Sequence, residues 1–276
     1  MIFLFFSQSR ESIELRWSNP KKVFSASGGT AIIEESYPSD SVLIILCQDT
    51  SKAPYVTSVY KFKISNYKIR LEKVYRGSLN INLFPTIRDL LVHGDMVYLL
   101  FYNLEGSPIS LKCLQIDLEK GTQEIFTIYE KDGIMFNGFE AEVDKYGNIH
   151  CIFNPGNRIP HYRAKIGNTW RDIVVGKFDE EEFRRINIDM PGLVNFDFKI
   201  DSLGRFHLVT EQVVGTGIMN SIVYLNSDDS GKTWKNPKIL QISMAIPPWD
   251  PKIFIDPRGN LHVIWTVSWN PIFKQN

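Results

Sequence analysis

The strongest constraint on the fold of this chain is a short pattern that returns at a fixed period. Three segments that begin at Asp144, Asp201 and Asp256 share the pattern D-x-x-G-[NR]-apolar-H, and their first residues lie 57 and 55 residues apart. Degenerate copies near Gly94 and Asp40 extend the same period toward the N-terminus. Such a period over 276 residues indicates a repeat architecture with five units.

Each repeat has the composition of antiparallel β-structure. Its apolar runs are short, rich in Val, Ile, Phe and Tyr, and separated by Gly, Asp, Asn and Pro. In D-x-x-G, Asp can bond the turn backbone and Gly can adopt the positive φ that a tight turn between strands requires. In one repeat we expect strands at 195–200, 205–211, 219–226 and 233–240. Four strands per repeat is the number in a β-propeller blade.

We therefore predict an all-β fold: a single β-propeller domain over residues 1–276, made of four-stranded antiparallel blades. The period favours five blades, and six is the alternative. This architecture places the whole chain in one repeat domain.

The two ends of the chain complement each other. The last repeat supplies only two strands, whereas residues 2–6 and 16–23 resemble the missing outer pair, and the element W-x-N-P-K starts at both Trp17 and Trp234. We expect the N-terminal strands to complete the C-terminal blade, because this closure removes exposed sheet edges.

Charge and composition exclude several classes of partner. Lys and Arg number 31 and Asp and Glu 31, so the formal net charge is zero, and we expect neither nucleic acid nor membrane as a partner. Residues 1–6 lack the features of a signal peptide, which favours a cytoplasmic location. Cys47, Cys113 and Cys151 are far apart without C-x-x-C spacing, which predicts buried thiols. We expect no cofactor and no metal.

A second motif lies in the fourth repeat. Residues 227–234 fulfil the pattern S-x-D-x-G-x-T-W through Ser227, Asp229, Gly231, Thr233 and Trp234. The motif resembles the Asp box, or BNR repeat, of the sialidase superfamily, and residues 167–170 keep its G-x-T-W half. The resemblance implies a β-propeller with this turn between the third and fourth strands of a blade, opposite the ligand face. Because Ser and Asp bond turn amides and Trp fills the blade periphery, we interpret the motif as structural.

The repeated His150, His207 and His262 allow two interpretations. Three histidines invite a metal site. However, equivalent positions of successive blades lie around a ring, and a side chain that recurs in each blade is typical of turn stabilisation. We expect these histidines to be structural.

A ligand site is expected in the irregular loops between second and third strands and between blades, which share one face. Trp249 is the candidate platform for a sugar, and arginines and acids are candidate polar contacts. The candidate ligand-binding residues are Asp49, Arg88, Arg158, Arg184, Glu211, Trp249 and Asp250.

The resemblance to sialidases implies an arginine triad, a Tyr–Glu nucleophile and an acid/base Asp, but no spacing in this chain selects catalytic residues. Residues 158–160 read R-I-P, an element that the family places on its first strand; here it lies in mid-chain, and we interpret it as a coincidence. We predict a sialidase-like propeller that binds a carbohydrate or another small anionic ligand without catalysis. The alternatives are an exo-glycosidase of the sialidase type and a protein-interaction scaffold.

Overall fold

The computed structural model describes residues 31–36, 41–49, 53–65, 68–80, 87–103, 108–131, 138–188, 192–214, 219–243 and 248–267. Within these ranges the chain is almost wholly β-structure, which confirms the all-β prediction. The N-terminal strands expected at 2–6 and 16–23 lie outside the described residues.

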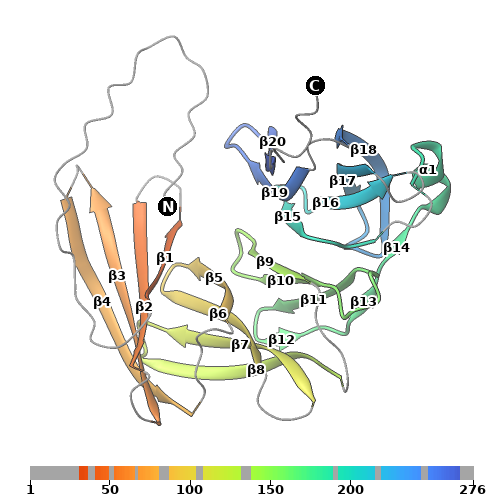
Figure 1. Cartoon of the computed structure of the whole chain (residues 1–276). Coiled ribbons are helices and arrows are strands. Elements are labelled where there is room, and N and C mark those ends of the chain that lie inside the picture. The colour runs from red at the N-terminus through yellow and green to blue at the C-terminus, as the bar shows by residue number, and fades with distance from the viewer. Residues whose placement is uncertain are drawn as a thin grey trace, which may run out of the picture.

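Five sheets follow one another in chain order within the described residues (Figure 1). The first contains β1 (Ala31–Ser36), β2 (Ser41–Asp49), β3 (Tyr55–Ser65) and β4 (Lys68–Leu79). The second contains β5 (Ile87–His93), β6 (Met96–Asn103), β7 (Ile109–Asp117) and β8 (Thr122–Lys131). The third contains β9 (Phe139–Val143), β10 (Ile149–Phe153), β11 (His161–Ile166), β12 (Thr169–Trp170) and β13 (Val174–Val175). The fourth contains β14 (Lys177–Phe178), β15 (Phe196–Ile200), β16 (Phe206–Val214), β17 (Met219–Ser227) and β18 (Thr233–Ser243). The last contains β19 (Pro248–Ile255) and β20 (Leu261–Val267).

The four strands expected in the fourth repeat correspond to β15, β16, β17 and β18. Three of them run beyond the expected ends, because β16 continues to Val214, β17 to Ser227 and β18 to Ser243. The sequence pattern stops at the polar pair Glu211 and Gln212, but the ladder between β16 and β17 continues to Val214 opposite Met219. Backbone pairing, rather than apolar alternation, decides where these strands end.

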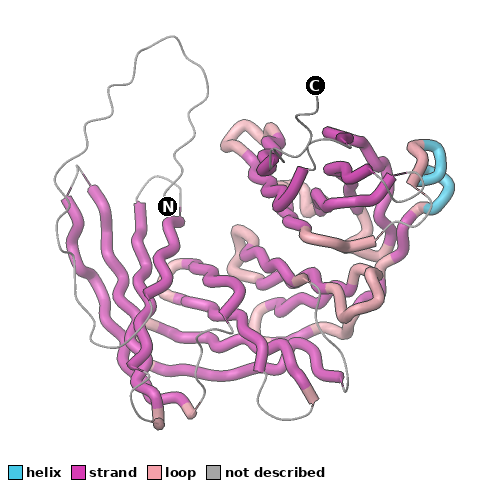
Figure 2. The backbone as a smooth tube through the Cα atoms, in the orientation of Figure 1, coloured by secondary structure: helices cyan, strands magenta, loops and turns pink. Residues whose placement is uncertain are grey.

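One strand of each sheet lies on the inner side of an arc of sheets, as the ribbon in Figure 1 and the tube in Figure 2 show; in the fourth sheet this strand is β15, and β14 lies at the opposite edge. The inner strands contact one another in the order β1, β5, β9, β15 and β19. Apolar side chains fill the space between successive sheets; Tyr102 packs edge-on against Phe139, and Tyr162 against Phe206. This is a β-propeller-like arrangement, in which each sheet buries its faces against its neighbours.

The D-x-x-G turns close the hairpins between the inner strand of a sheet and the strand beside it. Asp144 Oδ1 accepts hydrogen bonds from the backbone N–H groups of Tyr146 and Asn148 over 2.8 and 2.9 Å, and Gly147 has a φ of 81°. His150 joins this turn, since its Nε2 lies 3.3 Å from Asp144 Oδ2 and its Nδ1 lies 2.8 Å from the hydroxyl of Tyr162.

The same contacts recur in the next turns. His207 lies between Asp201 and Tyr224, at 3.2 and 2.7 Å, and His262 lies 3.3 Å from Asp256. These local contacts support the structural interpretation of the histidines. Among the described residues, no group of three or more His, Cys, Asp and Glu side chains has an arrangement that could hold a metal ion.

The turn between β17 and β18 is held by its own side chains. Ser227 Oγ accepts from the backbone N–H of Gly231 over 2.9 Å, and Asp229 Oδ1 accepts from Thr233 N over 2.8 Å. The ring of Trp234 is fully buried, and β14 covers it by pairing parallel to β18. Gly176, just before β14, allows this close approach: a Cβ there would lie 2.7 Å from the carbonyl oxygen of Gly231.

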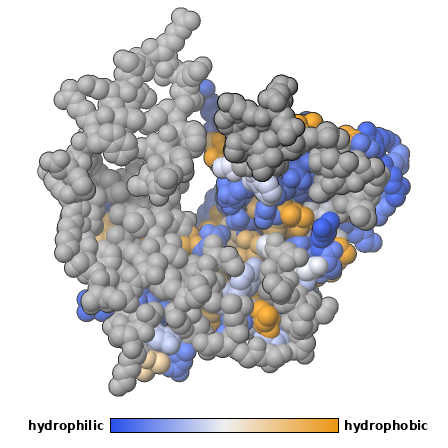
Figure 3. Space-filling model, viewed as in Figure 1, coloured by the Kyte–Doolittle hydropathy of each residue, from blue (hydrophilic) through white to orange (hydrophobic). Residues whose placement is uncertain are grey.

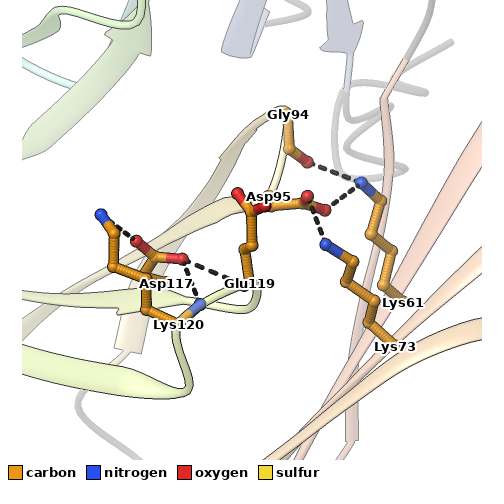
Figure 4. A network of polar contacts seen from close by, with 7 residues as sticks. All are labelled: Lys61, Lys73, Gly94, Asp95, Asp117, Glu119 and Lys120. Carbon is orange, nitrogen blue, oxygen red and sulfur yellow. Dashed lines mark hydrogen bonds and ion pairs between the residues drawn. The ribbon is translucent and has the colours of Figure 1, made fainter.

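An ion network fastens the first sheet to the second (Figure 4). Asp95, in the turn between β5 and β6, accepts hydrogen bonds from Lys61 Nζ over 2.8 Å and from Lys73 Nζ over 2.5 Å. Lys61 also donates to the carbonyl of Gly94 over 2.7 Å. Lysines from β3 and β4 of the first sheet therefore bind the same turn, between β5 and β6, of the second sheet.

Cys113 and Cys151 are free and buried, as predicted, and burial raises the pKa of the Cys113 thiol to about 12. The side chain of Cys47 lies outside the described part of the structure. No helix among the described residues has the length and apolar character needed to cross a membrane.

Candidate functional site

Four inner strands carry an ionisable residue at the same place. Glu140 on β9, Asp197 on β15 and Lys252 on β19 each lie four residues before the Asp that begins a D-x-x-G turn, and Asp89 on β5 occupies the matching position. Because the inner strands are neighbours around the arc, these side chains come together although they lie more than fifty residues apart in the sequence. We call Asp89, Glu140, Asp197 and Lys252 the inner-strand cluster.

The two aspartates of the inner-strand cluster tie successive sheets. Asp197 accepts from the backbone N–H of Phe198 over 3.0 Å and from that of Ile253, on the next inner strand, over 2.8 Å. Asp89 accepts from Leu90 over 2.8 Å and, across the sheets, from Ala141 over 3.3 Å.

Burial, together with the nearby charge of Glu140, raises the pKa of both aspartates to about 7. The hydrogen bonds from backbone N–H groups oppose this shift, because they favour the ionised carboxylate. Glu140 thus sits within electrostatic reach of two carboxyl groups that titrate near neutral pH.

Two lysines partly neutralise this acidic region. Lys252 Nζ lies 2.9 Å from Glu140 Oε1, and Lys199 on β15 forms an ion pair with Glu142 on β9. Burial lowers the pKa of Lys252, but Glu140 and Asp197 outweigh burial and raise it. Both lysines are therefore engaged by carboxylates of neighbouring strands.

Three predicted residues meet at the edge of this cluster. Glu211 on β16 is 9% exposed, and its carboxylate accepts from the side-chain amide of Asn195 over 3.1 Å and from the backbone N–H of Asp250 over 2.8 Å. Asp250 has a φ of 47°, a left-handed conformation that the hydrogen bond from its N–H to Glu211 helps to fix. Trp249 precedes it and is 41% exposed. An acid, a fixed turn and an exposed indole therefore adjoin.

Arg158 joins the same region through the loop after β10. Its carbonyl accepts from the backbone N–H of Leu193 over 2.8 Å, while Asn154 donates to the carbonyl of Leu193 over 2.7 Å. The side chain of Arg158 packs over Gly192 and is exposed, and its φ is 64°. Hydrogen bonds and chain neighbours link a set of residues that we call the loop face: 154–158, 192–195, Glu211, Trp249 and Asp250.

The other candidates lie apart or are not described. Arg184 belongs to α1 (Glu180–Arg185), a short helix capped by Asp179, where it pairs with Glu180 at 2.7 Å. This helix packs against β18 at the hydrophilic right-hand edge of Figure 3. Asp49 ends β2 and Arg88 lies in β5, and their side chains are outside the described part of the structure.

The sequence analysis missed the inner-strand cluster. A signal was present, because a charged residue stands four positions before the turn in three successive repeats, within strands that are otherwise largely apolar. Recurrence suggested a structural role, and only the packing of the inner strands shows that these charges share one environment.

The arrangement offers hydrogen-bond acceptors beside an aromatic surface. Carboxylates accept hydrogen bonds from hydroxyl groups, and an exposed indole offers a flat apolar face. Such a combination suits a polyhydroxylated ligand with both polar and apolar faces.

No protein-family model matches this chain, and no curated protein matches its sequence. Among solved structures, it is similar to an ulvan lyase bound to -[GlcA(1-4)Rha3S]-, with 10% identity and a TM-score of 0.51, over 86% of this chain and 62% of that one. It is also similar to an endo-arabinase from Bacteroides thetaiotaomicron, with 14% identity, a TM-score of 0.42, and coverage of 82% and 90%. A sialidase from Streptococcus pneumoniae shares 13% identity at a TM-score of 0.43, with coverage of 76% and 32%.

These three proteins are carbohydrate-active enzymes by name. The chain spans less than two thirds of the length of the ulvan lyase, and the identity is low, so this likeness concerns the fold alone.

Proposed function

We propose that this chain is a sialidase-like β-propeller that binds carbohydrate at the loop face without hydrolysing it. The observation that carries the proposal is the junction of Glu211, Asp250 and Trp249, in which a buried carboxylate fixes the turn beside an exposed indole. Sugar hydroxyls donate to carboxylates, and the apolar face of a sugar ring packs on indole. Arg158, exposed on the same face, is positioned to contact an acidic substituent.

The charge of the region favours hydroxyl recognition over a purely anionic ligand. Glu140 and Glu142 already engage Lys252 and Lys199, and Asp250 adds a further acidic group near Glu140. An anionic group would therefore meet net negative charge close to the inner-strand cluster. A largely neutral saccharide fits this environment better.

The sialidase superfamily is proposed from residues 227–234 and the hydrogen bonds that hold their turn. The likeness in fold to the ulvan lyase, which was determined with a bound oligosaccharide, is compatible with this proposal. We further propose a single domain of five blades in which residues 2–6 and 16–23 complete the sheet of β19 and β20, because that sheet has two strands within the described residues.

Hydrolysis is the second candidate. The observation in its favour is the pair Asp89 and Asp197, whose pKa values are raised to about 7 by burial and by Glu140. A carboxylic acid that titrates near neutral pH can serve as general acid. Against this role, both oxygens of each aspartate accept backbone N–H groups that link the sheets. We therefore prefer binding without catalysis.

A glycan array followed by titration calorimetry tests the proposal. We expect purified protein to bind a subset of saccharides, and Trp249→Ala to weaken that binding at least about tenfold, as loss of a central aromatic contact does. Phe254→Ala is the matched control, because Phe254 lies on the same strand and is 39% exposed but stacks on His262. Equal loss in both variants, or no glycan bound by folded protein, would contradict the proposal.

A panel of fluorogenic glycosides that includes an α-sialoside separates the two candidates. We expect no turnover. Turnover that Asp197→Asn abolishes while glycan binding persists would establish the hydrolase instead. Arg158→Ala tests whether Arg158 contacts an acidic substituent. The variant should bind acidic glycans more weakly and neutral glycans with unchanged affinity.

A further inference from the structure

A cavity of about 440 Å³ lies between the second and third sheets, and none of its lining residues belongs to the loop face. Its lining comes from β7, β8, β11 and the turns between β7 and β8 and between β11 and β12, and it includes Gln115, Glu124, Phe126, Lys165 and Asn168. Figure 1 shows β11 and β12 beside β7 and β8 at this place. The volume is in the range of small-molecule sites.

Lys165 is the unusual residue of this cavity. It is 4% exposed, and its ammonium group donates to the side-chain carbonyl of Gln115, a neutral partner. The ring of Phe126 lies 4.8 Å from Lys165 Nζ. Among the described residues, no carboxylate lies within ion-pair distance of this ammonium. A buried cation without a counter-ion is costly, because it has lost its hydration without gaining an opposite charge.

The charged groups that line the cavity do not form an ion pair with the ammonium group of Lys165. At the rim, Lys120 is already paired with Asp117 at 3.0 Å, as Figure 4 shows. Glu124 lines the cavity but lies beyond ion-pair distance, and it raises the pKa of Lys165 only against a larger lowering by burial. The ammonium group of Lys165 thus contacts the neutral side-chain amide of Gln115 and the aromatic ring of Phe126.

The other residues that line the cavity have mostly polar side chains. Thr122 and Asn168 supply a hydroxyl and an amide group and Phe126 one apolar wall, whereas the amide of Gln123 is already bonded to Tyr75 and Ser78. Hydroxyl and amide groups bond ligand hydroxyls, while the ring covers the carbon face of a ligand.

We propose that this cavity binds a hydroxylated carboxylic acid the size of a monosaccharide, with its carboxylate on Lys165 and its carbon face on Phe126. The carboxylate supplies the missing counter-charge, and its second oxygen can accept another N–H of the ammonium, which has three donors. This site is separate from the loop face and does not depend on the function proposed there.

Titration calorimetry with four probes tests the site: D-glucuronate, glucose, acetate and inorganic sulfate. We expect D-glucuronate to bind at least ten times more tightly than glucose, which has the hydroxyls without the charge, and than acetate, which has the charge without the hydroxyls. Lys165→Met should abolish D-glucuronate binding, whereas Lys120→Met, at the rim, should change it less than about twofold. Trp249→Ala should leave it unchanged, which separates this site from the loop face.

Asn168→Trp provides a second variant, because Asn168 is exposed in a turn and a large side chain there would obstruct the mouth without entering the core. We expect it to fold and to lose D-glucuronate binding. Should Lys165→Met fail to fold, this variant decides. Binding that persists in Asn168→Trp, equal affinity for glucose and D-glucuronate, or no binding by folded wild-type protein would each overturn the proposal.

Discussion

Asp197 on β15 accepts a hydrogen bond from the backbone N–H of Ile253 on β19 over 2.8 Å, so that one carboxylate joins the inner strands of two successive sheets. Asp89 on β5 makes the same kind of contact with Ala141 on β9 over 3.3 Å. Both carboxyl groups lie within the influence of Glu140. The contacts between sheets therefore include groups that titrate near neutral pH.

The stability of the protein should fall as pH rises from 5 to 7. The pKa of Asp197 is raised to about 7, above its unfolded value of roughly 4, so the folded state keeps a proton that the unfolded state releases. The stabilisation is fully present below about pH 4 and is lost as pH rises through 7; a shift of this size corresponds to at most about 4 kcal/mol. Urea unfolding at several pH values measures the slope, and Asp197→Asn should make it shallower.

Asp201→Asn is the control for that experiment. Burial opposes ionisation of Asp201, but hydrogen bonds from Arg205 and His207 lower its pKa to about 2. Its contribution is therefore lost as pH falls from about 4 through 2, outside the tested window. A slope between pH 5 and 7 that changes equally in both variants would refute the assignment to Asp197.

Removal of Asp95 should weaken the contact between the first two sheets. Asp95→Ala leaves the ammonium of Lys61, whose side chain is 11% exposed, without its carboxylate partner, and we expect a loss of about 1–3 kcal/mol in the free energy of unfolding. Lys120→Ala breaks an ion pair whose lysine is 74% exposed and should cost less than about 1 kcal/mol. Chemical denaturation compares the two, and similar losses would show that the Asp95 network is no stronger than a surface pair.

Gly176→Ala should destabilise the packing of β14 over Trp234. The added Cβ would lie 2.7 Å from the Gly231 carbonyl oxygen and 2.9 Å from both Pro160 Cγ and Trp234 Nε1, and backbone cannot yield easily, so we expect a loss of about 1–3 kcal/mol. Gly167→Ala serves as comparison, because that glycine has a φ of 57° but no atom within 4 Å of an added Cβ. Its cost should be near 1 kcal/mol. The thermal midpoints of the two variants measure this difference, and we expect the lower midpoint for Gly176→Ala.

Substitution of Trp17 tests the proposed closure. If the N-terminal segment completes the last sheet, Trp17 takes the place that Trp234 has in the fourth sheet, where the indole is fully buried. Trp17→Ala should then cost about 3–5 kcal/mol, as truncation of a buried tryptophan does, and Trp234→Ala should cost a similar amount. A change below about 0.5 kcal/mol in Trp17→Ala, typical of an exposed position, would contradict closure by this segment.

The sequence predicted the local features well because each depends on contacts within a few residues. The bonds from Asp144 to Tyr146 and Asn148, and those from Ser227 and Asp229 to the turn that follows, span two to four positions. Candidate site residues were harder to judge. Glu211, Trp249 and Asp250 adjoin, but Arg184 lies on an outer helix, because the segment after β14 turns away to cover β18.

The period, the all-β class, the turn chemistry and the strands of the fourth repeat could be predicted from the sequence, since these follow from side-chain alternation and from local hydrogen bonding. Which distant residues share an environment, in contrast, depends on how the sheets pack together. Glu140 and Lys252 are 112 positions apart, and Gln115 and Lys165, from the second and third sheets, line one cavity. Periodicity fixes the place of a residue within its own sheet, whereas the charge around it depends on the packing of neighbouring sheets.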